Sequence, residues 1–166
     1  LDPGDGQRWY SVGHDERLRR GLALQAMMLA LPGSLYLRQG DEIALSDSDK
    51  PTAPLELADM VIEHTQGQAS QFGSPAATVR HAAHVRLEYN LACAPLAFVT
   101  GLEWCPAEAL AFLVRGVLVV VNTSDAPIVL PPEAKVLLSS QPLRQDQGRL
   151  LVPPTTATWL EATTVA

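Results

Sequence analysis

Apolar and polar positions follow different periods in the two parts of this sequence. In residues 16–31, leucines and a glutamine recur at spacings of three and four, which predicts a mostly buried helix. We expect Asp15 to cap that helix and Pro32-Gly33 to end it. The next apolar run, residues 34–38, is short and continuous, which is typical of a strand covered on both faces. Together these elements form an α/β unit.

Polar stretches rich in glycine and proline flank this unit. Residues 1–16 are expected to be mostly loop. Residues 46–74 form a long connection with one short helix within 54–64, and loops of such length are often functional. A second helix is predicted over residues 74–92, with Ser74 as its cap and proline in the first helical position.

The character of the sequence changes from about residue 101. Short runs of valine, leucine and phenylalanine are separated by turn signals, which predicts an antiparallel β-sandwich. Arg115-Gly116 is expected to form a tight hairpin between two of its strands. We therefore predict an α+β chain in two parts, residues 1–100 and residues 101–166.

Composition excludes several classes of protein. The 166 residues are 47% hydrophobic and 18% charged, which suits a packed core, and the net charge of −6 argues against a nucleic-acid partner. The longest apolar run near the start is shorter than the 20 or so residues that span a bilayer, so no membrane partner is expected. Cys93 and Cys105 are expected to be free thiols in a reducing cytoplasm.

The strand region carries a motif that points to a family. The segment from Pro32 to Glu42 resembles the last barrel strand of the α-amylase superfamily of glycoside hydrolases, which typically reads PGxxYxYQGEE. Arg38 stands where that family usually has an aromatic residue, and Asp41 where it usually has glutamate. Val121-Asn122-Thr123 and the late run TATWLEA resemble strands of its C-terminal sandwich. The overall order is most similar to bacterial α-glucosidases that act on short oligosaccharides. The matching residues of the strand motif are Pro32, Gly33, Tyr36, Gln39, Gly40 and Glu42.

This resemblance implies the closing α/β unit of a (β/α)₈ barrel followed by a sandwich. It also implies that Gln39, Gly40, Asp41 and Glu42 form the rim of a sugar pocket, with an oligosaccharide as the partner of the parent enzyme. A complete barrel takes about 250 residues, so this chain cannot contain one. In the family, three catalytic carboxylates come from earlier strands, which would precede Leu1. We assign no catalytic residue, metal or cofactor to the chain and expect it to be inactive alone.

Asp41 and Glu42 are not expected to replace the missing carboxylates. Neighbouring residues on a strand point to opposite faces, so the two cannot face one sugar together. Two alternatives to an enzyme fragment stay open, a non-catalytic scaffold relative and a sugar-binding β-module that uses Trp104 and Trp159. Self-association through exposed barrel surfaces is a further expectation.

Two other groups of residues are interpreted structurally. His81 and His84 share a helix face, but no acidic or cysteine partner is placed to complete a metal site. Cys93 is expected to be a small core residue rather than a nucleophile.

Overall fold

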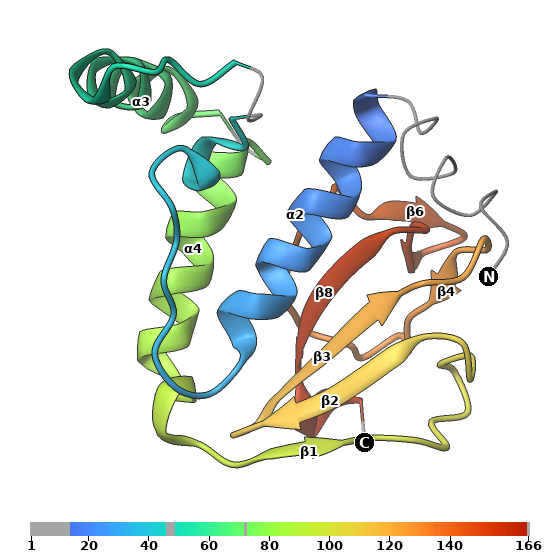
Figure 1. Ribbon diagram of the computed structural model, residues 1–166. Coiled ribbons are helices and arrows are strands. Elements are labelled where there is room, and N and C mark those ends of the chain that lie inside the picture. Colours follow the sequence, from blue (N-terminus) through green and yellow to red (C-terminus); the bar gives the residue numbers. More distant parts are fainter. Residues whose placement is uncertain (1–13, 46–48, 72, 166) are drawn as a thin grey trace, which may run out of the picture.

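The computed structural model describes residues 14–45, 49–71 and 73–165, and the side chain of His14 lies outside this description (Figure 1). Among the described residues, three α-helices precede the strands: α2 (His14–Ala30), α3 (Pro54–Gln68) and α4 (Pro75–Glu88). Short 3₁₀ helices are η1 (Asp41–Ile43), η2 (Leu91–Cys93) and η3 (Ala162–Thr164). The strands are β1 (Leu96–Phe98), β2 (Leu110–Val114), β3 (Val117–Asn122), β4 (Ile128–Val129), β5 (Val136–Ser139), β6 (Arg144–Asp146), β7 (Arg149–Val152) and β8 (Thr156–Glu161).

The strands form two antiparallel sheets, so the prediction of an α+β chain with an antiparallel β part is confirmed. The larger sheet has the order β1-β2-β3-β8-β5 and the smaller has the order β4-β7-β6. Leu118 and Val120 on one face of β3 pack with Ile128 and Val152 of the smaller sheet. This contact makes the two sheets the layers of a sandwich.

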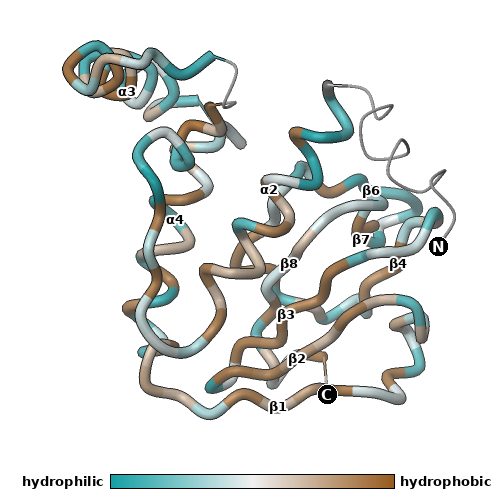
Figure 2. The backbone as a smooth tube through the Cα atoms, viewed as in Figure 1, coloured by the Kyte–Doolittle hydropathy of each residue, from teal (hydrophilic) through white to brown (hydrophobic). Residues whose placement is uncertain are grey.

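Helices cover the other face of the larger sheet (Figure 1). Val119 and Trp159 belong to the same buried cluster as Ala23, Ala26 and Ala30 of α2. Small alanine side chains let the helix backbone approach the sheet, and the indole Nε1 of Trp159 donates to the carbonyl oxygen of Ala26 at 3.2 Å. Hydrophobic residues accordingly follow β2 and β3 almost without interruption in Figure 2, because both faces of these strands are covered.

Asn122 joins the ends of the strands. It is fully buried, and its side-chain amide donates to the carbonyl oxygens of Ala126, Val152 and Pro153 at 2.8, 3.0 and 3.1 Å. The side-chain oxygen Oδ1 of Asn122 accepts hydrogen bonds from the backbone N–H and the hydroxyl group of Ser124. The Val-Asn motif thus satisfies backbone groups where β3 leaves the core.

Several predicted local elements are confirmed. The Ser74 hydroxyl accepts from the backbone N–H of Ala77 at 3.2 Å, and proline follows it at the start of α4. Arg115 and Gly116 both have positive φ, at 40° and 76°, which matches the two-residue hairpin between β2 and β3. The expected short helix in the long connection is also present as α3, although it extends to Gln68.

The predicted strand at residues 34–38 is wrong. This segment belongs to no described strand, and Tyr36 is 88% exposed. The chain here leaves the end of α2 and runs back past α4 to η1 (Figure 1). A strand needs a neighbouring strand to bind its backbone groups, and no described strand lies beside these residues. The apolar pattern alone cannot supply that neighbour.

The structure bears on several smaller predictions. Cys93 is exposed rather than part of the core, although both cysteines are free as expected. The helix α2 already includes His14, so Asp15 lies in its first turn rather than at its cap. The first thirteen residues of the expected opening loop lie outside the described residues. The division of the chain near residue 100 stays a prediction, and helices and strands share one of the buried clusters.

Replacing Trp159 should reveal how strongly α2 depends on the sheet. Trp159→Phe removes the hydrogen bond to Ala26 and part of a fully buried side chain. We expect the free energy of unfolding to fall by about 2–4 kcal/mol, measured by urea denaturation. Trp104→Phe is the matched control, because Trp104 is only half-buried and its Nε1 lies 3.4 Å from the Val165 oxygen. Equal losses in the two variants would contradict this role.

Candidate functional site

The segment predicted as a pocket rim forms a compact turn. Gly40 has a φ of 98°, and a Cβ at this position would lie 3.2 Å from Leu45 Cδ2, so glycine suits both the conformation and the space. The backbone N–H of Gly40 donates to Glu42 Oε2 at 2.8 Å. Asp41 Oδ2 accepts from the backbone N–H of Arg38 at 3.0 Å. Both carboxylates of the rim therefore bind backbone groups of their own turn.

A groove lies between this turn and α2. The Gln25 side-chain amide donates to the carbonyl oxygen of Asp41 at 2.8 Å and ties the two elements together. The groove has a volume of about 500 Å³, and its polar lining consists of Arg17, Gln25 and Asp41. Gln39, Gly40 and Glu42 do not line it. Its walls are otherwise mostly apolar, from Leu18, Leu22, Leu24, Met28, Leu37 and Leu45.

This groove is suited to binding more than to acid–base chemistry. Retaining glycosidases place two carboxyl groups about 5–5.5 Å apart. Among the described lining residues the groove has one carboxylate, Asp41, and its Oδ1 lies 3.6 Å from Lys50 Nζ. No pair of carboxylates in the described lining could therefore divide the roles of nucleophile and acid.

Arg86 holds the segment that leads to the rim. Its Nη1 donates to the carbonyl oxygens of Leu29, at 2.8 Å, and Leu31, while Nη2 donates to that of Gly33. A guanidinium group here satisfies carbonyl groups at the end of α2 and complements the negative end of the helix dipole. Sequence reasoning missed this residue, because a basic residue near the end of α4 carries no sign of which carbonyl groups it will meet.

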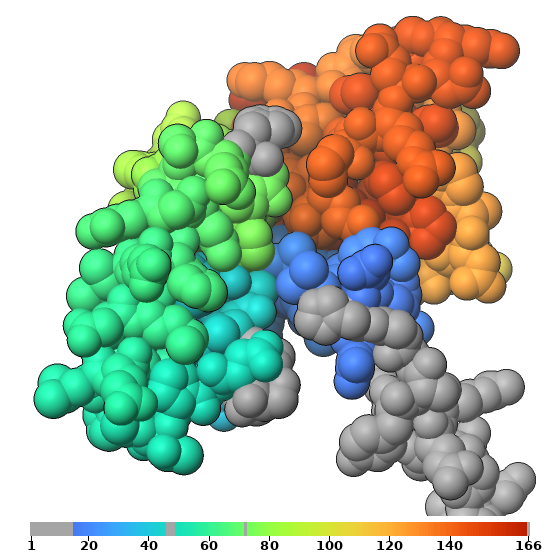
Figure 3. Space-filling model, turned by 90° about the horizontal axis from the view of Figure 1, so that it is seen from above, coloured from blue at the N-terminus to red at the C-terminus, as the bar shows by residue number. Residues whose placement is uncertain are grey.

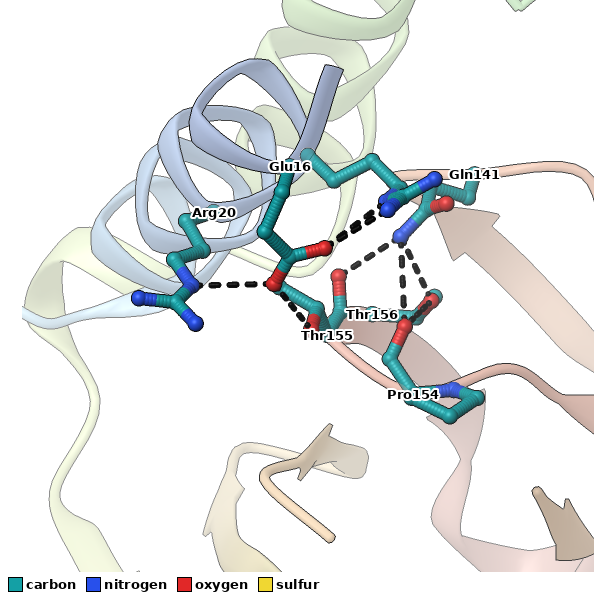
Figure 4. Close-up of polar contacts among 7 residues, drawn as sticks. Glu16, Arg20, Gln141, Pro154, Thr155 and Thr156 are labelled. Carbon is teal, nitrogen blue, oxygen red and sulfur yellow. Dashed lines mark hydrogen bonds and ion pairs between the residues drawn. The ribbon is translucent and has the colours of Figure 1, made fainter. Parts of the chain in front are cut away.

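The other end of α2 is anchored by Glu16 (Figure 4). Its carboxylate accepts from Arg19 at 2.6 Å, from Arg20 at 2.9 Å and from the Thr155 hydroxyl at 3.2 Å. The hydrogen bonds from Arg19 and then Arg20 hold the pKa of Glu16 below its ordinary value. Gln141 supports the same turn, because its side-chain amide donates to the backbone carbonyl oxygen of Thr155 at 2.6 Å.

The described histidines and cysteines show neither a metal site nor a thiol activated as a nucleophile. His81 Nε2 lies 2.7 Å from the carbonyl oxygen of Leu137, so it binds the outer edge of β5. Within residues 14–45, 49–71 and 73–165, no group of three or more histidine, cysteine, aspartate or glutamate side chains could hold a metal ion. Burial raises the pKa of the Cys105 thiol, which disfavours the thiolate form needed of a nucleophile.

Comparisons with known proteins reveal the fold but no family. No protein-family model matches the sequence, and a search of curated proteins found no match. Among solved structures, Eubacterium rectale Amy13B matches 90% of this chain with a TM-score of 0.59 and 13% sequence identity. The pullulanase SAP of Group B Streptococcus matches 87% of the chain with a TM-score of 0.51 and 13% identity. At such identities the likeness shows a shared fold.

The matched proteins are much longer than this chain. The chain spans 35% of the length of Amy13B and 28% of the length of the pullulanase. It therefore shares its architecture with only part of each. In the described parts of the chain, no helix is both long and apolar enough to cross a membrane.

The anchor at Glu16 should make stability depend on pH. Because the pKa of Glu16 is lowered in the folded state, its contribution is present above the unfolded pKa of about 4.3 and is lost as pH falls through the folded value. We expect Glu16→Gln to lower the free energy of unfolding by about 0.5–1 kcal/mol at pH 7. The difference from the unmodified chain should shrink below about pH 4.

Urea denaturation at a series of pH values measures this difference. Glu133→Gln is the control, because Glu133 is exposed and takes no part in the contacts that join Glu16 to Arg19, Arg20 and Thr155. A deficit in Glu16→Gln that stays constant down to pH 2 would exclude an ionic origin.

Proposed function

We propose that this chain is a non-catalytic part of an α-glucosidase of the α-amylase superfamily, acting in carbohydrate metabolism. The parent reaction would be the retaining hydrolysis of short α-linked gluco-oligosaccharides. One observation carries the proposal: nine-tenths of the chain shares the fold of part of Amy13B. The likeness to part of a protein named as a pullulanase supports it, since that name denotes a carbohydrate-cleaving enzyme. The PGSLYLRQGDE motif supports it independently, because the motif is a property of the sequence and does not depend on the fold.

The proposed contribution of the chain is structural. The sandwich and α2 would brace a catalytic part supplied by other polypeptide, and Gln39 to Glu42 would lie at the rim of its sugar pocket. The single carboxylate in the described groove supports this division of labour, because hydrolysis with retention needs two. Free thiols at Cys93 and Cys105 support a cytoplasmic location.

The alternative of a sugar-binding β-module loses its main support. Trp159 is fully buried under α2 and cannot stack on a sugar ring. Trp104 is half-buried and its indole N–H is directed at Val165. A scaffold protein of the same fold would keep the same structure, so the experiments below separate it from an enzyme part.

The isolated chain should not hydrolyse α-glucosides. Purified protein is assayed with maltose, sucrose, isomaltose and a chromogenic α-glucoside, and no release of glucose or chromophore above background is expected. The reason is the lack of a carboxylate pair in the described groove. Hydrolysis that Asp41→Asn or Glu42→Gln abolishes would show that the rim itself is an active site.

The coding sequence upstream of Leu1 distinguishes the remaining candidates. Barrel strands that end in the aspartate, glutamate and second aspartate of the superfamily are expected there. A barrel without these carboxylates would indicate a scaffold protein, and the absence of any barrel would overturn the proposal.

A further inference from the structure

The outer edge of β5 has no strand beside it in the described chain. β5 is the last strand of the larger sheet, and among the described strands only β8 pairs with it. The backbone N–H of Ser140 donates to the carbonyl oxygen of Ala157 at 2.9 Å. In an antiparallel pair every second residue binds the neighbouring strand, so the N–H and carbonyl groups of Ser139 point away from β8. No described residue binds either group.

The side chains of this edge agree with that assignment. Ser139 Oγ lies 3.3 Å from Thr158 Oγ1, and opposite side chains approach most closely where the backbone bonds of the ladder are absent. The edge is also uncharged, because β5 reads Val-Leu-Leu-Ser, whereas exposed edges are commonly protected by charged residues or proline. The backbone of β5 is therefore free to pair with a further strand.

A groove of about 610 Å³ follows this edge, which is within the size range of ligand-binding pockets. One wall is the unbroken run of residues 136–143. Neighbouring side chains of a strand point to opposite faces, so a strand that lines a groove with consecutive residues presents its backbone edge. The other wall includes Ala77 and His81, one turn apart on α4, and His81 Nε2 lies 2.7 Å from the carbonyl oxygen of Leu137. In Figure 3 the green atoms of α4 meet the orange atoms of this run on the face seen from above.

The chemistry of the lining favours an uncharged extended chain. The described lining contains no aspartate, glutamate, lysine or arginine, and no aromatic side chain of the kind that stacks on sugar rings. A peptide backbone supplies both the acceptor and the donor that match the outward groups of Ser139. Such main-chain bonds to an edge strand, with alternate side chains in adjoining pockets, are a recurring mode of peptide binding. The apolar walls here are formed by Ala77, Val136, Leu137, Leu138, Pro142 and Leu143.

We propose that this groove binds an extended, uncharged peptide segment of another protein, which adds to the outer edge of β5 as a further strand. Ser139 would bind a carbonyl oxygen and an N–H of that segment. A single segment fits better than a second copy, because antiparallel pairing of two β5 edges would bring the α4 helices of both copies together beside the shared edge. The site shares no lining residue with the groove beside α2, so it goes beyond the proposed function and does not depend on it.

Fluorescence anisotropy of a labelled peptide with alternating valine and threonine residues and a lysine at each end tests the proposal. We expect saturable binding to the 166-residue chain. Ser139→Pro removes the outward N–H without removing a bond to β8, and it should raise the dissociation constant at least about tenfold. Ser139→Ala is the matched control, because it keeps that N–H and should bind as the unmodified chain does. Circular dichroism confirms that each variant is folded.

Hydrogen exchange in the unmodified chain gives a second readout that needs no variant. The peptide should slow exchange at the amide of Ser139 and change that of Ser140 much less, because Ser140 already donates to Ala157. Replacing the valines of the peptide with proline should abolish both binding and protection.

Three results would overturn the proposal. One is a lack of saturable binding, and another is binding that leaves the Ser139 amide unprotected, which would indicate apolar contact without strand addition. The third is a dimer of the chain alone that Ser139→Pro separates, since a second copy would then cover the edge.

Discussion

Trp159 lies beneath α2 with its indole N–H on the carbonyl oxygen of Ala26, and this contact joins residues far apart in the sequence. The central strands of the larger sheet are buried on both faces and carry apolar side chains on each, so each face needs a cover that excludes water. The smaller sheet covers one face, and α2 covers the other with its alanines. Because these side chains are small, the helix sits close to the sheet, and the indole fills the space beneath it.

The position of α2 then decides where the rim lies. Arg86 binds the carbonyl groups at the end of this helix, and Gln25 on its side binds the carbonyl oxygen of Asp41. Glu16 fixes its beginning to the turn before β8. Through these polar contacts the sandwich positions a turn that belongs to no strand. A groove with mostly apolar walls lies where α2 and the turn meet.

The groove and the fold bear on function in different ways. The fold is shared with parts of two much longer proteins, and at 13% sequence identity this likeness concerns architecture alone. The described groove, however, contains apolar walls and a single carboxylate, and these suit contact with another surface. Fold and local chemistry are therefore separate kinds of evidence, because function resides in sites rather than in folds.

Local sequence determined those elements whose signals lie within a few residues. Ser74 and the following proline begin α4, Arg115-Gly116 makes the hairpin, and short apolar runs between turn signals predict the strands. Caps, tight turns and apolar runs are all signals that act over short distances. Tertiary structure decided the rest. Residues 34–38 have the apolar pattern of a strand, yet they do not form one. A strand exists only where a neighbouring strand binds its backbone groups. Trp159 and Arg86 likewise acquired their roles from helix carbonyl groups that only the folded chain brings to them.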